Sequence, residues 1–454
     1  MDFWDALPLI MFVVLGCLLF SGYPVAFVLG GVALTFGSIG VIGDMFSPIE
    51  FFNILPRIWG GVAENPVLTA VPMFIFMGTM LERSNVANDL LNTLQILLRR
   101  VPGGLALSVT VMGTILAATT GIIGASVVMM TLLALPVMLA RGYNKELATG
   151  TIAASGTLGI LIPPSIMLVI MADLLAISVG NLFVAAIFPG LILAGLYMLY
   201  ILVLSRLRPK LAPSLSDAEA PGSAAELAVL IVRSFLPPVF LIVLVLGSIF
   251  AGWATPTEAA GVGAAGSTLL AYVNRQLTGE VLRDVCERTA LTGAMIFFIF
   301  VGATAFSYVF RSLGGDDVIL DVIENTGFGS WGVLFLLMGT VFFLGFFFDW
   351  VEITLIVLPV FGPIFELLDF GEHVAQADKI YWFTILVAVN LQTSFLTPPF
   401  GFALFYMKGV APPTVKLQNI YRGIVPFVTL QLIGLGIVLA FPDVALWLPR
   451  QLLD

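Results

Sequence analysis

The feature that most constrains this chain is a double proline inside a long apolar segment, and it occurs twice. The first copy is Thr151–Ser165, which reads Thr-Ile-Ala-Ala-Ser-Gly-Thr-Leu-Gly-Ile-Leu-Ile-Pro-Pro-Ser and stays apolar to Met171. The second copy is Asn390–Phe400, which reads Asn-Leu-Gln-Thr-Ser-Phe-Leu-Thr-Pro-Pro-Phe. Two prolines remove two backbone donors and end a helix, so the carbonyl groups before them lose their partners. In a bilayer such groups are tolerated only where protein or a watery cavity covers them.

The composition predicts an all-α polytopic membrane protein. Hydrophobic residues make up 59% of the 454 residues, the mean hydropathy is +1.08, and apolar runs near the ~18 residues that span a bilayer recur. The acidic N-terminus has no basic region, so the first apolar run is expected to be a retained span. Cys17 and Cys286 lie in opposite halves, which indicates no disulfide framework. The formal net charge of −9 argues against nucleic acid as a partner.

We expect two related halves, at 1–208 and 231–454, joined by a cytoplasmic linker at 209–230. The first half is expected to hold spans at 6–21, 24–42, 66–82 and 182–205, an amphipathic stretch at 48–60, an interfacial arm at 85–100, a re-entrant hairpin at 103–140 and a broken helix at 145–175. The second is expected to hold spans at 234–251, 257–273, 290–311 and 423–441, an amphipathic stretch at 276–288, a hairpin at 331–367 and a broken helix at 380–410.

Two observations predict that the halves are inverted repeats. Thr131–Val137 matches Thr354–Val360 at five of seven positions, and the order of the elements agrees apart from a longer acidic connection in the second half. Placing the ends of the first hairpin in the cytoplasm puts fifteen of the nineteen Lys and Arg residues inside, and Arg57, Arg311, Lys379 and Arg450 outside. The hairpins then enter from opposite sides, and both termini lie outside.

Each half pairs a hairpin tip with a helix break, and both are expected near the middle of the bilayer. Freed carbonyls and helix C-terminal ends favour a small hard cation such as sodium, whereas helix N-termini favour a carboxylate. Hydroxyl and amide groups complete the sites: Thr119, Thr120, Ser126, Ser155 and Thr157 in the first half, and Asn390, Gln392, Thr393, Ser394 and Thr397 in the second. Taken singly, such a hydroxyl more often bonds its own helix, and a glycine more often allows close packing.

Asp349 and Glu352 are carboxylates in an apolar setting, three residues apart at the second tip, Phe346–Ile353. Intramembrane carboxylates suggest function by default. The alternative is that they cap the second helix of the hairpin, either together or with Glu352 alone while Asp349 faces the cavity. Glu258 is expected to be a first-turn helix residue rather than a site, and His373 a solvated residue of an acidic outer loop.

Four motifs closely resemble the large membrane subunit of tripartite ATP-independent periplasmic (TRAP) transporters. They are Gly159–Ser165, Trp253–Ala260, Thr354–Val360 and Leu396–Gly401, and the resemblance covers essentially the whole chain. It implies sodium-coupled uptake of an organic acid by an elevator motion, in which the hairpins and broken helices slide against a scaffold of the remaining spans. It also implies a periplasmic substrate-binding protein and a small four-helix membrane subunit, which we expect to be a separate chain.

Carried over by position, the resemblance places one sodium site at 120–126 and 155–163 and another at 346–352 and 392–398. The implied sodium-binding residues are Thr120, Gly121, Gly124, Ser126, Ser155, Gly156, Thr157, Pro163, Asp349, Gln392, Thr393, Ser394 and Thr397. The implied substrate-binding residues are Thr119, Ser165, Asp349, Glu352, Asn390 and Pro398. Relatives often have a serine-rich first tip, whereas this one reads Thr-Thr-Gly-Ile-Ile-Gly-Ala-Ser, so backbone carbonyls are expected to supply most ligands there.

Sodium is the only metal expected, and no cofactor is. The expected location is the bacterial inner membrane, with both termini in the periplasm. The alternative within transport is a one-component divalent-anion/sodium symporter, which shares the plan of inverted hairpins. A channel would need a continuous polar lining, and a membrane enzyme would need the pair Asp349 and Glu352 as its reactive groups.

Overall fold

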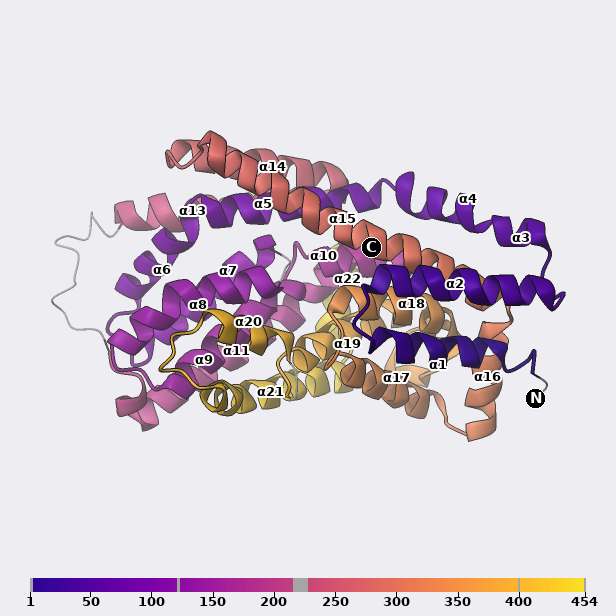
Figure 1. The fold of residues 1–454 in the computed structure, drawn as a ribbon. Helices are drawn as coiled ribbons and strands as arrows, with labels where there is room; N and C mark the ends of the chain where they lie inside the picture. Colours follow the sequence, from indigo (N-terminus) through magenta and orange to yellow (C-terminus); the bar gives the residue numbers. More distant parts are fainter. Residues whose placement is uncertain (1–2, 121–122, 215–227, 399–400, 453–454) are drawn as a thin grey trace.

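The computed structural model describes residues 3–120, 123–214, 228–398 and 401–452, with the side chains of 117–120 and 322–326 excepted. Within these ranges every regular element is a helix. Seven of the described helices are long and apolar enough to cross a membrane, or eight if Pro48–Ala63 and Val67–Arg83, which meet at 52°, form one span. Most of the long helices run along a common direction (Figure 1). The predicted all-α polytopic membrane fold is therefore confirmed.

The first half has helices at the positions of the predicted spans, hairpin and broken helix. Its elements are α1 (Leu7–Leu19), α2 (Val25–Ile42), α3 (Pro48–Phe52), α4 (Ile54–Ile58), η1 (Trp59–Ala63), η2 (Val67–Thr69), α5 (Ala70–Arg83), α6 (Val86–Leu97), α7 (Gly104–Thr120), α8 (Ile123–Ala140), α9 (Lys145–Thr157), η3 (Leu158–Ile160), α10 (Ile166–Leu174) and α11 (Val179–Leu207). The expected interfacial arm is α6, which packs against α7 and buries Leu90, Leu91 and Leu94.

The second half repeats this order. Its elements are η6 (Ile231–Phe235), α13 (Leu236–Phe250), α14 (Pro256–Val273), α15 (Gly279–Ser312), α16 (Gly315–Thr326), α17 (Ser330–Leu344), α18 (Trp350–Leu367), α19 (Lys379–Ser394), α20 (Phe402–Val410), α21 (Leu417–Ala440) and α22 (Asp443–Leu452). The hairpin is α17 and α18, and the broken helix is α19 and α20.

Three expectations for the second half were incomplete. The amphipathic stretch and the span after it form one helix, α15, because no proline or glycine pair interrupts them. The acidic connection is not a plain loop, because α16 occupies it in the position that α6 has in the first half. A further helix, α22, follows the last span and packs against α11.

Helices of the two halves exchange partners in the packed structure. α5 packs against α14 and α15 packs against α2, while α10 contacts α18 and α20 contacts α8. Two copies of one unit related by inversion would produce this exchange. The two hairpins also lie toward opposite ends of the molecule (Figure 1). The repeat boundaries at 208 and 231, and the side from which each hairpin enters, stay predictions.

The hairpins and broken helices pack together with α11 and α21. α9 contacts α7, α8 and α21, and α19 contacts α11, α17 and α21. α11 and α21 correspond to the spans at 182–205 and 423–441, which were expected in the scaffold, but these contacts join them to the hairpins. We call this set, α7–α11 and α17–α21, the hairpin group. It meets the other helices where α5 contacts α7 and where α15 contacts α18.

Two residues outside the hairpin tips have clear structural roles. Glu258 and Thr255 form a capping box at the start of α14, as expected for a first-turn residue. The expectation that His373 is solvated was wrong. Its ring is half-buried between Trp331 and Trp382, and its Nε2 lies 2.9 Å from the carbonyl oxygen of Leu439, because the outer loop folds back onto α21.

Candidate functional site

The first helix break is built by Pro163 and Pro164, which are both buried between η3 and α10. Neither proline has an N–H group for the carbonyl four residues earlier, so the carbonyls of Gly159 and Ile160 lose their usual partners. The hydroxyl of Ser165 donates to the carbonyl of Ile160 at 2.6 Å and caps α10 through the N–H of Leu168. Ser165 was predicted to bind substrate, and its hydrogen bonds stabilise the break. The carbonyl of Ile160 thereby gains a new partner, and the carbonyl of Gly159 remains the one freed by the prolines.

The predicted residues just before this break are buried where three helices meet. Ser155 lies against Thr110 of α7, with 3.3 Å between the two hydroxyl oxygens. Gly156 faces α8 so closely that a Cβ atom there would lie 2.7 Å from Cγ2 of Val127. The hydroxyl of Thr157 donates to the carbonyl of Ala154 in its own helix. The structure thus brings the first break against both helices of the first hairpin.

The first tip is described from Ile123 onward, where Ser126 is buried and Gly124 is half-buried. The predictions for Thr119, Thr120 and Gly121 fall outside the residues whose side chains the structure describes. A Cβ atom at Gly124 would lie 3.0 Å from the ring of Tyr406 in α20. The first tip therefore touches the helix that follows the second break.

The second break has the same construction as the first. Pro398 has no N–H for the carbonyl of Ser394, which accepts instead from the N–H of Thr397 at 3.0 Å. The hydroxyls of Thr393, Ser394 and Thr397 each donate to a carbonyl of α19, as isolated hydroxyls in membrane helices usually do. Their oxygen lone pairs remain available, so these bonds are compatible with a cation.

The second hairpin lies directly against this break. Asn390 donates from its side-chain nitrogen to the carbonyl of Met338 in α17, at 2.7 Å. A Cβ atom at Gly345, where α17 ends, would overlap the side chain of Ser394. Gly401 begins α20 with a φ of +51°, a backbone conformation that glycine adopts readily. The second tip and the second break are therefore neighbours, as the first pair is.

Gln392 faces away from the second tip, toward α11 and α21. The hydroxyl of Tyr197 lies next to the side-chain amides of Gln392 and Gln431, and all three residues are fully buried. By distance and angle, none of their polar side-chain atoms has a hydrogen bond within the described residues. Buried polar atoms without partners are costly, so this polar cluster is a functional candidate in its own right.

Asp349 and Glu352 form the capping box at the start of α18. The carboxylate of Asp349 accepts from the N–H of Trp350 at 2.8 Å, and that of Glu352 accepts from the N–H of Asp349 at 3.3 Å. Both carboxylates also lie close enough to Tyr406 to interact electrostatically with its hydroxyl. The capping geometry holds for both residues, and a role in binding ions or substrate stays a prediction.

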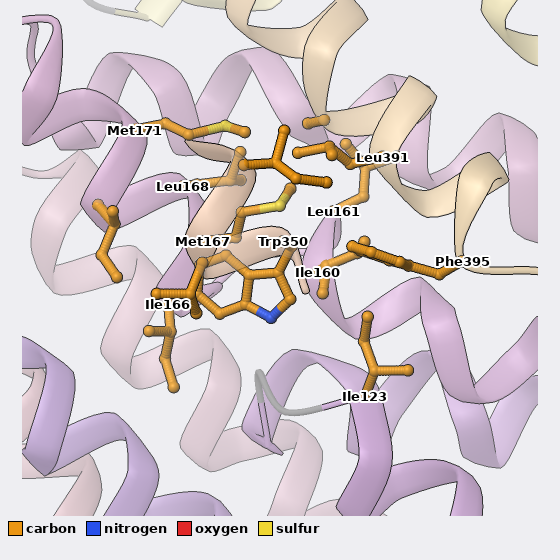
Figure 2. Packing of buried hydrophobic residues seen from close by; sticks show 14 of the residues in the cluster. Ile123, Ile160, Leu161, Ile166, Met167, Leu168, Met171, Trp350, Leu391 and Phe395 are labelled. Carbon is orange, nitrogen blue, oxygen red and sulfur yellow. The ribbon is translucent and has the colours of Figure 1, made fainter. Parts of the chain in front are cut away.

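A shared apolar cluster holds these pieces together. Figure 2 shows Trp350 of the second tip packed beside Ile160 and Ile166 of the first break, with Phe395 of the second break and Ile123 of the first tip nearby. Ile160, Ile166, Phe395 and Trp350 are all at most 3% exposed. The two tips and the two breaks therefore meet at one place in the molecule, although they come from four distant segments.

Sequence reasoning missed three residues at this meeting point. Tyr406 bridges the two tips, and Tyr197 and Gln431 complete the cluster around Gln392. The signal for Gln431 was present, because an amide inside the apolar run of α21 is unusual in a membrane helix. Tyr406 had no such signal, since an aromatic residue in an apolar helix is usually packing.

Comparison with known proteins finds similarity over the whole chain. The family model described as tripartite ATP-independent periplasmic transporter, DctM component, matches residues 10–444. The chain is 31% identical over 422 residues to the C4-dicarboxylate TRAP transporter large permease protein DctM of Pseudomonas aeruginosa, covering 91% of this chain and 94% of that protein. It is 28% identical over 454 residues to the isethionate TRAP transporter permease protein DctMQ of Oleidesulfovibrio alaskensis, covering 98% of this chain and 67% of that protein.

A solved structure has a similar fold. The YdaH transporter of Alcanivorax borkumensis aligns with a TM-score of 0.61 at 13% sequence identity, over 88% of each chain. At this identity the likeness concerns the fold alone. It agrees with the arrangement of helices described above.

Proposed function

Because the chain belongs to the family of the DctM component of tripartite ATP-independent periplasmic transporters, we propose that it is the large transmembrane subunit of a sodium-coupled importer of an organic acid. The observation that carries this proposal is the meeting of two hairpin tips with two proline-broken helices. Each break interrupts the regular hydrogen bonds of a helix inside an apolar surround, and membrane transporters hold ions at such breaks near the bilayer centre.

This geometry supports a proposal of two sodium sites. The first uses the freed carbonyl of Gly159 with oxygens of Ser155 and the first tip. The second uses oxygens of Thr393, Ser394 and Thr397 with the end of α17. These ligands are neutral oxygens, which suit a small monovalent cation. Binding through them avoids the free-energy cost of desolvating a carboxylate. The capping bonds of Asp349 support a role in shaping the second tip, with its charge attracting the cation.

The substrate class follows from the family and from the site. The relatives named above include a permease for C4-dicarboxylates and one for isethionate, both small organic acid anions. In this chain the N-terminus of α10 faces the meeting point of the tips, and a helix N-terminus favours an anion. We therefore propose a small organic acid as the substrate, held near Ser165 and Tyr406.

Two partners are proposed with the chain. The isethionate relative is a longer protein, of which this chain covers 67%. We propose that the small membrane subunit that completes the transporter is a separate four-helix chain here, and that a periplasmic binding protein delivers the substrate. The proposed location is the bacterial inner membrane, with both termini periplasmic. In an elevator motion, the hairpin group would slide along α5 and α15.

The test is uptake in proteoliposomes that hold the chain with its small membrane subunit. A panel of labelled carboxylates is offered with and without the periplasmic binding protein, under an inward sodium gradient or an equal potassium gradient. We expect uptake only with both sodium and the binding protein. Equal uptake in potassium would overturn the sodium coupling. Sodium-driven uptake without the binding protein would favour the one-component symporter instead.

A further inference from the structure

A cavity outside the proposed sodium sites lies between the hairpin group and the helices α4 and α15. Its volume is about 420 Å³, within the range of small-molecule sites. α4 and α15 form one side of the cavity, and the other side is formed by the end of α10 at Leu174 and the middle of α18 at Leu355 and Pro359. It therefore spans the boundary along which the hairpin group would move.

The polar lining of this cavity is basic and rich in hydroxyl groups. The lining side chains with polar atoms are Arg57, Thr304, Ser307, Tyr308, Arg311 and Ser312. Arg57 and Arg311 are two of the four basic residues that the charge distribution predicts on the outer side. The other two are engaged elsewhere, since Arg450 pairs with Asp378 and Lys379 bonds the carbonyl of Leu368.

The two guanidinium groups are only partly compensated. Arg57 lies over the ring of Tyr308, 5.8 Å from its centroid, and within the described residues it has no ion pair. Arg311 lies 3.7 Å from the carboxylate of Asp316. Among the described residues this is the one ion pair that either of the two guanidinium groups makes. A guanidinium binds a carboxylate through two parallel hydrogen bonds, which the hydroxyls around it could complement.

Arg311 also bonds across the cavity to the second hairpin. Its guanidinium donates to the carbonyl of Pro359 in α18. That carbonyl is free because Pro363, four residues on, has no N–H to donate. The hydrogen bond of Arg311 thus links α15 to the hairpin group. Its acceptor, the carbonyl of Pro359, can be replaced by the carboxylate of an incoming anion.

We propose that this cavity binds a small carboxylate between Arg57 and Arg311, before the carboxylate reaches the meeting point of the tips. Binding transfers Arg311 from the Pro359 carbonyl to the carboxylate and so loosens the link between α15 and α18. The site's place in import rests on the proposed function. The binding itself does not, because it needs neither sodium nor a partner protein.

The experiment measures the charge and occupancy of the cavity on the full chain alone. Cys17 and Cys286 are replaced by alanine, and Ser307→Cys supplies one thiol in the lining. Its reaction rate is measured in proteoliposomes with an anionic and a cationic methanethiosulfonate reagent, bearing sulfonate and trimethylammonium groups. We expect the anionic-to-cationic rate ratio to fall by about tenfold in the pair Arg57→Gln/Arg311→Gln, since two screened charges act on each reagent.

Occupancy is measured with succinate as the probe, without sodium. We expect succinate to slow labelling by about fivefold or more, and to have no effect in the glutamine pair. Arg57→Lys should keep the charge preference but weaken protection, because lysine cannot bind a carboxylate with two parallel bonds. Arg450→Gln, which removes an outer arginine elsewhere, is the matched control and should change neither result.

Several outcomes would overturn the proposal. They are equal rates with both reagents, a thiol that neither reagent reaches, and protection that persists in the glutamine pair. Protection by the periplasmic binding protein but not by succinate would assign the surface to protein docking instead. Normal labelling and protection in a chain that shows no sodium-driven uptake would leave the cavity site standing and remove only the proposed function.

Discussion

The contact between Gly156 and Val127 offers a sharp test of the first sodium site. A Cβ atom at Gly156 would lie 2.7 Å from Cγ2 and 3.3 Å from Cα of Val127, whereas ordinary contact begins at 3.4 Å. Gly156→Ala must therefore push α8 away from the first break by about 0.7 Å, the difference between 3.4 and 2.7 Å. The Cα atom of Val127 is only just inside ordinary contact, so the collision is with Cγ2. A valine in a helix has one strongly preferred χ1 rotamer, so Cγ2 cannot readily rotate away.

The energetic effect on folding should be small. Overpacking of this kind costs about 1–3 kcal/mol, and alanine recovers about 0.5–1 kcal/mol in a helix. For a chain of 454 residues, 1 kcal/mol corresponds to a shift in Tm of about 1 °C. We expect Tm to fall by about 2 °C or less. Sodium binding should change more, because its proposed ligands lie on both sides of the displaced contact.

The assay is sodium-driven uptake in proteoliposomes, measured against sodium concentration. We expect the half-maximal sodium concentration to rise by about tenfold in Gly156→Ala, which corresponds to about 1.4 kcal/mol of binding free energy. Val127→Ala in the same chain removes the colliding Cγ2 and should recover most of this loss. Gly195→Ala is the matched control, because nothing lies within 4 Å of a Cβ there.

One result would refute the reasoning directly. Suppose that Gly156→Ala has the expected lower Tm but the same sodium dependence of uptake as the unmodified protein. The first break and the first hairpin then do not bind a cation between them. A loss of uptake that Val127→Ala fails to recover would place the defect elsewhere.

Three further predictions concern the second half and the coupling ion. Gln392→Leu should abolish sodium-driven uptake without lowering Tm, because it removes two buried polar atoms that have no hydrogen bond to any residue the structure describes. A Tm lower by several degrees would show that the amide is a structural partner of Tyr197. Asp349→Asn keeps an acceptor for the helix cap, so we expect a normal Tm and reduced uptake. Asp349→Ala should reduce uptake and also lower the free energy of unfolding by about 1 kcal/mol. Unchanged uptake in Asp349→Asn would show that Asp349 acts only as a helix cap. Replacing external sodium by choline should stop uptake by the unmodified transporter. Adding potassium should not restore uptake, as measured with labelled substrate.

The parts of the fold that a sequence predicts well are those with a local chemical cause. Prolines 163 and 398, each the first of a proline pair, stand where helices end, because neither residue of such a pair has an N–H. Single prolines such as Pro363 lie inside helices, so it is the pair that predicts the break. The hairpins could be placed because their short apolar helices flank a polar tip. α16 was missed although Val318, Ile319, Val322 and Ile323 follow the helical period. The segment was expected only as a longer acidic connection.

The candidate site was harder, because its geometry depends on contacts between the halves. Nothing near Tyr406 in the sequence indicates that its ring meets Gly124, which lies 282 residues earlier in the chain. Gln392 was predicted from its position in the break, yet the turn of α19 directs it toward Tyr197. A sequence pattern assigns residues to a helix face, and only packing decides which helix that face meets.

The same packing indicates how ion and substrate binding could be coupled. Tyr406 contacts the first tip at Gly124 and lies near the carboxylates of Asp349 and Glu352 at the second. A cation that drew the first tip toward its break would change the space open to this ring, and hence its distance from the second tip. Coupling of this kind needs no long chain of intermediates, because a single side chain borders both tips. Tyr406→Phe should then preserve the coupling if the ring acts by shape, and Tyr406→Ala should weaken it.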